Sequence, residues 1–140
     1  MSTILDTNVV SALMRGDDEA IVALTRAGKG NVAVPHLVFA EIVYGIERLT
    51  ASRRRDRLRE RLDLLLGELP RAPWTDAVSE AFGRVKAELE RRGKRIEDFD
   101  AAIAAHAVAT GATLATMDKK HMARVPGLVV EDWSRQESRA

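Results

Sequence analysis

The sequence lacks cysteine altogether. This absence excludes a disulfide framework, a thiolate zinc site and a cysteine nucleophile, and it is compatible with a reducing compartment. Aromatic residues are also scarce, at 4% of the 140 residues. A protein that binds single-stranded nucleic acid by stacking bases on aromatic rings is therefore disfavoured, and we interpret Trp74 and Trp133 as core or edge residues.

Long apolar runs are missing as well. The longest uncharged stretch, residues 101–117, consists mostly of Ala, Thr and Gly, which are too weakly apolar to hold a bilayer span. The first residues carry neither the basic region nor the apolar region of a signal peptide. We therefore expect no membrane association and a cytoplasmic location.

The residues that are present have the composition of a globular protein, with 46% hydrophobic and 31% charged residues. The length predicts a single domain, over residues 1–133, followed by a polar tail over 134–140. The net charge of +1 hides three basic clusters, within residues 53–61, 91–95 and 119–124. Such clusters suit a phosphate-bearing partner, although solvated helix faces explain the first cluster equally well.

Short apolar segments alternate along the chain with segments of helical periodicity. Strands are expected over residues 2–5, 31–34, 69–72, 113–116 and 128–130, and helices through 9–14 and 21–24 and over 36–49, 52–66, 75–92 and 99–110. Alternation of this kind predicts an α/β fold with a mainly parallel central sheet.

Acidic residues follow the predicted strands. Asp6 comes directly after the first strand and Asp118 directly after the strand at 113–116, while Asp100 lies in the first turn of the helix before that strand. Sites in open parallel sheets form beyond the carboxyl ends of the strands. These three carboxylates are therefore expected to converge on one edge of the sheet.

Glu41 differs because it lies inside a predicted helix. Its helical neighbours are Leu37, Val38, Tyr44 and Gly45, so its carboxylate is expected to be partly buried. Gly45 costs the helix about 1 kcal/mol relative to alanine, and a close approach by a backbone or a ligand would explain why it is tolerated. The alternative is an ordinary, half-exposed glutamate beside a packing glycine.

Asp98 and Asp100 cannot both face the same way, because positions two apart on a helix point about 200° from each other. Asp98 precedes the apolar run and suits the N-cap position. Asp100 shares its face with Ile103, Ala104 and Ala107, and an inward-facing carboxylate needs a reason such as a metal. We therefore assign Asp98 to structure and Asp100 to chemistry.

Clustered carboxylates repel one another, and a divalent cation removes that conflict. Oxygen ligands without a Cys or His cluster favour Mg²⁺ or Mn²⁺ over Zn²⁺, and such an ion activates water for attack on a phosphodiester; the number of ions stays open. Hydrogen bonds to the carboxylates are expected from Thr7, Asn8 and Thr116. Three histidines are candidate general bases in principle, namely His36, His106 and His121, but they are scattered, and we interpret each as a structural or surface residue.

Several segments together resemble the PIN-domain ribonucleases, and more narrowly the VapC-type toxins of bacterial toxin–antitoxin pairs. The resemblance covers nearly the whole chain and is carried by Ile4–Asn8, the helix with Glu41, Asp100–Ala107, Thr113–Asp118 and Val125–Trp133. Each motif is weak alone, but their order and spacing make the set specific. Met117 departs from the pattern, since many relatives have Asn before or at the last acidic position.

The resemblance implies a three-layer α/β/α sandwich and an endoribonuclease that uses Mg²⁺ or Mn²⁺. The family's four acids fall on Asp6, Glu41, Asp100 and Asp118. Asp6 and Asp100 would bind the metal, and Glu41 and Asp118 would do so directly or through water. The resemblance also implies a homodimer held in a hetero-oligomer by an antitoxin, whose C-terminal segment covers the active site. Operator DNA would be bound only through the antitoxin.

Two other functions are weighed against this one. A phosphoryl-transfer enzyme of the haloacid-dehalogenase type also places an aspartate after its first strand, but it needs a second aspartate two residues later, and position 8 is Asn. A non-catalytic PIN-like binding module is the other alternative. Retention of all four acids argues against it, because a scaffold has no use for their mutual repulsion.

Overall fold

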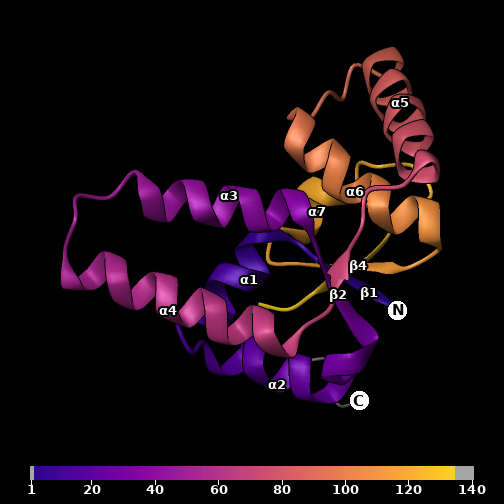
Figure 1. The fold of residues 1–140 in the computed structure, drawn as a ribbon. Coiled ribbons are helices and arrows are strands. Elements are labelled where there is room, and N and C mark those ends of the chain that lie inside the picture. Colours follow the sequence, from indigo (N-terminus) through magenta and orange to yellow (C-terminus); the bar gives the residue numbers. More distant parts are fainter. Residues whose placement is uncertain (1, 135–140) are drawn as a thin grey trace.

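The computed structural model describes residues 2–134, so the predicted tail lies outside the described residues except for Ser134. The elements, shown in Figure 1, are β1 (Thr3–Leu5), α1 (Thr7–Met14), α2 (Asp18–Ala27), the 3-10 turn η1 (Lys29–Asn31), β2 (Val32–Pro35), α3 (His36–Glu47), α4 (Arg53–Glu68), β3 (Arg71–Ala72), α5 (Asp76–Arg91), α6 (Asp98–Thr110), β4 (Thr113–Thr116), α7 (Lys119–Met122) and β5 (Val129–Asp132).

One five-stranded sheet forms the centre, with strand order β3-β2-β1-β4-β5 and parallel pairing throughout. β1 lies in the middle, where Thr3 is opposite Val32 of β2 and Thr113 of β4. The chain moves outward from β1 to β3 and then returns through α5 and α6 to β4, on the other side of β1. The predicted α/β fold, with helices flanking a parallel sheet, is confirmed, and the carboxyl ends of its strands share one edge.

Local signals fix where the helices begin and end. Asp17 caps α2, Ser52 caps α4 and Thr75 caps α5, each through a side-chain oxygen that accepts a backbone N–H of the first turn. α6 ends at Gly111, which has a φ of 70°. That left-handed conformation is easy only for glycine.

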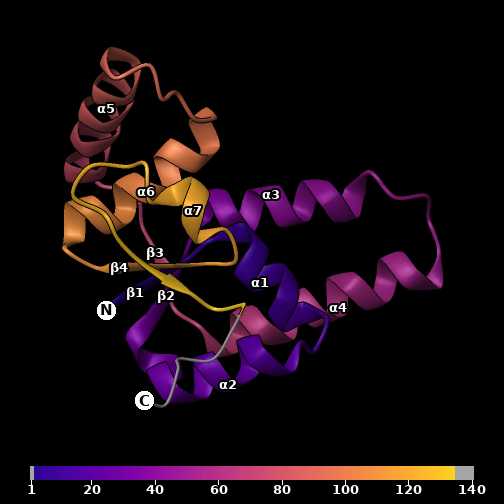
Figure 2. The ribbon, with the colours of Figure 1, turned by 180° about the vertical axis from the view of Figure 1, so that it is seen from behind.

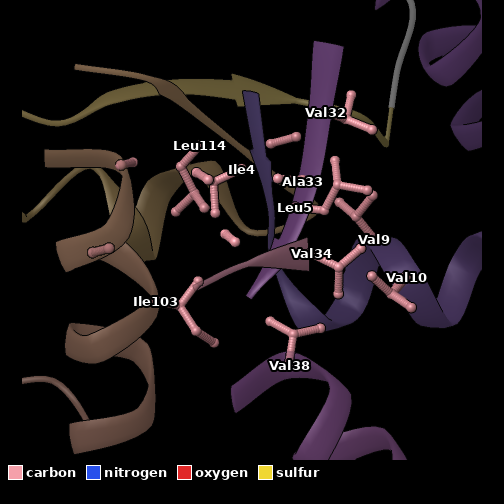
Figure 3. Packing of buried hydrophobic residues seen from close by; sticks show 14 of the residues in the cluster. Ile4, Leu5, Val9, Val10, Val32, Ala33, Val34, Val38, Ile103 and Leu114 are labelled. Atoms are coloured by element: carbon pink, nitrogen blue, oxygen red, sulfur yellow. The ribbon is translucent and has the colours of Figure 1, made fainter. Parts of the chain in front are cut away.

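The core lies between the sheet and the helices on its two sides. Ile4 and Val34 are buried in the strands, and Figure 3 shows Ile103 of α6 on the opposite side of these strands from Val9 and Val10 of α1. Burying an aliphatic side chain of this size stabilises the fold by about 1.5–3 kcal/mol. The sheet edge that carries the acids is therefore anchored from both sides.

α3 and α4 pair as a helical hairpin that projects away from the sheet, while α5 and α6 pack together at the other end of the molecule (Figures 1 and 2). α1 contacts both arms of the hairpin near its base. Among the described residues, no helix is both long enough and apolar enough to cross a membrane.

Several local predictions were wrong or incomplete, and three of the differences have a clear cause. α6 begins at Asp98 rather than Phe99, and its N-cap is Glu97, without a side-chain cap bond. The short helix α7 was not predicted, because four residues are too few to show a period. β5 runs to Asp132 rather than ending at Val130, since pairing with β4 continues through Thr116 opposite Asp132.

Candidate active site

A cavity of about 460 Å³ opens at the edge of the sheet where β1 and β4 end. Asp6 follows β1 and Asp118 follows β4, while Asp100 reaches the cavity from the first turn of α6 and Glu41 from the middle of α3. All four predicted acids line this one cavity. Residues separated by up to 112 positions in the sequence are thus brought together by the parallel sheet.

Asp6 is the most enclosed of the four acids, with 5% of its surface exposed. Its Oδ1 accepts the backbone N–H of Thr7 at 2.8 Å, and its Oδ2 accepts the hydroxyl of Thr116 at 2.7 Å. Burial raises the pKa of the Asp6 carboxyl, the two hydrogen bonds oppose that rise, and the negative charge of Asp100 adds to it. Two hydrogen bonds therefore fix the orientation of the Asp6 carboxylate, while burial makes its ionised form unfavourable.

Glu41 is half-buried and is held from α1. The hydroxyl of Thr7 donates to Glu41 Oε1 at 2.6 Å, so one residue orients two carboxylates: Asp6 through its backbone and Glu41 through its side chain. The pKa of Glu41 is raised, chiefly by burial, and the charges of Asp100 and Asp6 raise it further. Three carboxylates thus lie close enough to repel one another.

Asp100 faces the cavity beside His121, whose Nε2 lies 3.2 Å from Asp100 Oδ2. The scattered position of His121 in the sequence indicates a structural or surface role and does not reveal this contact. The available signal was its place three residues after Asp118: the Asp118 side chain accepts the His121 backbone N–H at 3.2 Å and caps α7. That cap turns the chain so that the imidazole lines the cavity.

A polar network joins the loop after β4 to α1. Asn8 Oδ1 accepts the backbone N–H of Met117 at 3.1 Å, and the hydroxyl of Thr116 accepts that of Asp118 at 3.1 Å. Asn8 Nδ2 also lies 3.4 Å from the Thr116 hydroxyl. Met117 lines the cavity and takes part through its backbone, so its own side chain is not required for the network. The network fixes the loop that carries Asp118.

Asp98 points away from the cavity and forms an ion pair with Lys86 of α5 at 3.1 Å. The separation of Asp98 from Asp100 agrees with the helix-face argument, but the N-cap role given to Asp98 is wrong, because the residue is already helical. Its side chain ties α6 to α5 instead.

The other rings lie away from the cavity. Trp133 is fully buried, whereas Trp74 is partly exposed and packs edge-on against His106. His106 is buried with no hydrogen-bond partner for its Nε2 among the described atoms, and burial lowers its pKa. A neutral imidazole in an apolar setting accounts for this position.

The donor set suits a hard, hydrated cation. Within residues 2–134, no three acidic or imidazole side chains form a ready-made cluster that could hold a metal. Mg²⁺ does not need one, since it keeps several waters and binds through one or two carboxylates. Asp6 and Asp100 are close enough for their negative charges to repel each other. No Lys or Arg of the described chain forms an ion pair with either. These residues therefore fit Mg²⁺ or Mn²⁺.

Comparison with known proteins places this geometry in a family. The PIN domain model matches residues 3–128. The chain is 32% identical to Ribonuclease VapC2 of Rickettsia felis over 137 residues, which cover 96% of this chain and all of that protein. It is 28% identical to the tRNA(fMet)-specific endonuclease VapC of Shigella flexneri over 133 residues, or 93% of this chain and 96% of that protein.

Solved structures agree with this placement. The crystal structure of VapBC2 from Rickettsia felis bound to a DNA fragment from their promoter contains a chain similar to this one at 30% identity and a TM-score of 0.86, covering 95% of this chain and 99% of that one. DNA-bound VapBC from Salmonella typhimurium gives a TM-score of 0.85 at 22% identity over 95% and 98% of the two chains, a likeness of fold alone. This chain belongs to the PIN-domain family and, within it, to the VapC ribonucleases.

Proposed function

We propose that this VapC ribonuclease is an endoribonuclease that requires Mg²⁺ or Mn²⁺ and acts in the cytoplasm as the toxin of a toxin–antitoxin pair. One observation carries the metal requirement: four carboxylates from separate elements line one cavity, and no Lys or Arg of residues 2–134 forms an ion pair with any of them. Repelling charges held in this way favour a bound divalent cation, because no lysine or arginine of the described chain is paired with them.

Each side chain has a definite part in the proposed reaction. A bound divalent ion would acidify the attacking water and stabilise the charge that develops on the phosphate. Asp6 and Asp100 would hold the ion, with Glu41 and Asp118 binding it directly or through water. Thr7 and Thr116 keep the Asp6 carboxylate in place before the ion arrives. Such preorganisation spares the site from rearranging during the reaction.

RNA is the substrate class that the relatives support. The protein from Rickettsia felis is named a ribonuclease, and that from Shigella flexneri a tRNA(fMet)-specific endonuclease. We extend the ribonuclease activity to this chain and leave the RNA species to experiment. A cognate antitoxin whose C-terminal segment covers the cavity is proposed as the partner, with a homodimer inside the complex. Operator DNA would be reached only through the antitoxin.

The haloacid-dehalogenase-like alternative loses its remaining support. Asn8, which stands where that chemistry needs a second aspartate, uses its side-chain oxygen to hold the backbone of Met117. The match of residues 3–128 to the PIN domain also argues against the haloacid-dehalogenase-like alternative. The non-catalytic module remains to be separated by experiment.

Cleavage of end-labelled RNA by the purified chain tests the proposal. We expect cleavage with Mg²⁺ or Mn²⁺ and none with chelator, and a loss of at least about a hundredfold in Asp6→Asn and Asp100→Asn. Asp98→Asn is the matched control for Asp100→Asn, because it makes the same change two residues away and outside the cavity, and its activity should stay within twofold of the unmodified chain.

The outcomes separate the two remaining functions. Cleavage that survives chelation, or either cavity substitution, would exclude the metal mechanism. A chain that binds RNA but cleaves none of the tRNA, rRNA and mRNA pools under any metal would instead be a binding module.

A further inference from the structure

Helix α1 presents a polar stripe to the acidic cavity, and the stripe ends in an arginine. Thr7, Ser11 and Arg15 follow one another at intervals of four residues, so they share one face of the helix, and all three line the cavity with the acids. The opposite face carries buried aliphatic residues, including Val9 and Val10. The stripe is therefore turned toward the cavity by packing of the rest of α1.

Arg15 is the one arginine or lysine among the described residues that line the acidic cavity, and its guanidinium is not engaged. Arg55 and Arg59 on α4 pair with Glu47 and Asp63, and Arg92 pairs with Glu88. Over residues 2–134, no ion pair or side-chain hydrogen bond involves the guanidinium of Arg15, and the residue is exposed. A cation beside four carboxylates, with no carboxylate bound to it, is free to bind an anion from solution.

The position of Arg15 indicates which anion it meets. Arg15 comes nine positions after Asp6, at the C-cap of α1, which is roughly 13 Å along the helix at 1.5 Å per residue. It also lines a second hollow, between the end of α1 and α4, to which Arg61 contributes. Arg15 thus lines both the acidic cavity and a neighbouring hollow that contains Arg61 and Glu68, and its backbone lies well along α1 from Asp6.

We propose that Arg15 binds a phosphate of the RNA that flanks the scissile one, on the strand that leaves the acidic cavity toward α4. The inference rests on the proposed ribonuclease function. A metal at the acids would neutralise the scissile phosphate but not its neighbours, whose charge would be repelled by the remaining carboxylates. A guanidinium fork offers two parallel N–H donors to the oxygens of such a phosphate.

Salt-dependent RNA binding tests this assignment. An Asp100→Asn background prevents cleavage, and a fluorescein-labelled RNA oligonucleotide is titrated at several KCl concentrations with Mg²⁺ present. Adding Arg15→Gln should weaken binding about tenfold near physiological salt and reduce the slope of log K against log salt by about 0.7, the value for one contact to a single strand. Arg15→Lys should keep the slope.

Arg26→Gln on α2 is the matched control, since it removes another exposed arginine near a helix end that lines neither hollow. In the otherwise unmodified chain, Arg15→Gln should raise KM for RNA while kcat stays within about threefold. If Arg15→Gln matches Arg26→Gln in slope and KM, the inference is wrong.

The inference would also be wrong if Arg15→Gln changed only the Mg²⁺ concentration needed for half-maximal activity. That result would show that Arg15 only reduces the negative potential of the carboxylates and does not bind a phosphate. Failure of the proposed function looks different. The unmodified chain would then cleave no RNA, whereas the binding slope would still show whether Arg15 contacts a phosphate.

Discussion

Single side chains in or behind the cavity contact two partners at once, and Thr116, buried behind the cavity, is an example. Its hydroxyl donates to Asp6 and accepts from the backbone of Asp118, so it couples the first and the last acid of the set. The residue is fully buried, and no water is needed to satisfy it. The position of one hydroxyl therefore affects both the pKa of Asp6 and the conformation of the loop after β4.

Replacing Thr116 with valine removes that hydroxyl without changing the volume. We expect the free energy of unfolding to fall by about 2 kcal/mol, because a buried carboxylate loses a donor and a backbone N–H loses its acceptor. Activity should fall at least about tenfold. The hydrogen bond from Thr116 lowers the pKa of Asp6, so its loss moves the acid limb of the pH–rate profile to higher pH. Urea unfolding and pH-dependent cleavage measure the two effects.

Thr116→Ser restores the hydroxyl and should return the acid limb to its original position. An unchanged acid limb in Thr116→Val would mean that Asp6 does not control the reaction in this pH range.

At the residue scale, the sequence was most informative where a carboxylate adjoins a predicted strand. Asp6 and Asp118 could be placed because parallel strands end at one edge, and Asp100 because a helix face has a fixed direction. His121 could not be placed. Its approach to Asp100 depends on the cap that Asp118 makes over a helix of only four residues, and no periodicity reveals so short an element.

At the element scale, α3 carries Glu41 into the cavity and continues outward as one arm of the projecting hairpin. Gly45 lies one turn beyond Glu41 on this helix. The sequence suggested a close approach at this glycine, but a Cβ built there has no heavy atom of the described chain within 4 Å. The helix therefore bears the cost of a glycine without an internal packing reason.

Gly45→Ala should stabilise the isolated chain by about 0.5–1 kcal/mol, since alanine restricts the unfolded chain and favours the helix. Thermal unfolding measures the gain, and RNA cleavage should be unaltered. Gly83→Ala on α5 is a matched control in another helix, where an added Cβ also meets open space. A destabilised Gly45→Ala beside a stabilised Gly83→Ala would contradict the open surface seen at α3.

Helix boundaries were predicted to within a few residues because capping chemistry is local. Ser52 and Thr75 mark the starts of α4 and α5, and Gly111 marks the end of α6. The edge strands were harder. β3 has two residues and β5 is largely exposed on one face, so their pairing with β2 and β4 depends on the whole sheet rather than on their own sequence.

At the scale of the whole molecule, the fold stabilises an arrangement that its own charges oppose. The pKa values of Asp6 and Glu41 are both raised above their ordinary values. The native state therefore binds protons more tightly than the unfolded chain at these two groups. Their ionisation lowers stability as pH rises from about 4 through the raised pKa values, and the penalty is complete above those values. A bound cation would remove that penalty.

Glu41→Gln isolates this effect, because glutamine keeps the oxygen that accepts the Thr7 hydroxyl and loses only the charge. In chelator at pH 7.5 the variant should be more stable than the unmodified chain by about 0.5 kcal/mol after solvent screening, or ~2 °C in Tm. This advantage should shrink as pH falls through the raised pKa of Glu41 and vanish below its ordinary value of 4.5. Thermal unfolding of both proteins across that range gives the difference directly.

Mg²⁺ should reverse the order of stability. When the Mg²⁺ concentration is ten times the dissociation constant, binding stabilises the chain by about 1.4 kcal/mol. The variant should gain less, because a neutral amide replaces one of the negatively charged carboxylates. His106 titrates in both proteins and cancels in the comparison, since it lies away from the cavity in the buried contact with Trp74. An advantage for Glu41→Gln that is independent of pH, or that persists undiminished in saturating Mg²⁺, would show that repulsion among these carboxylates is not what the cation relieves.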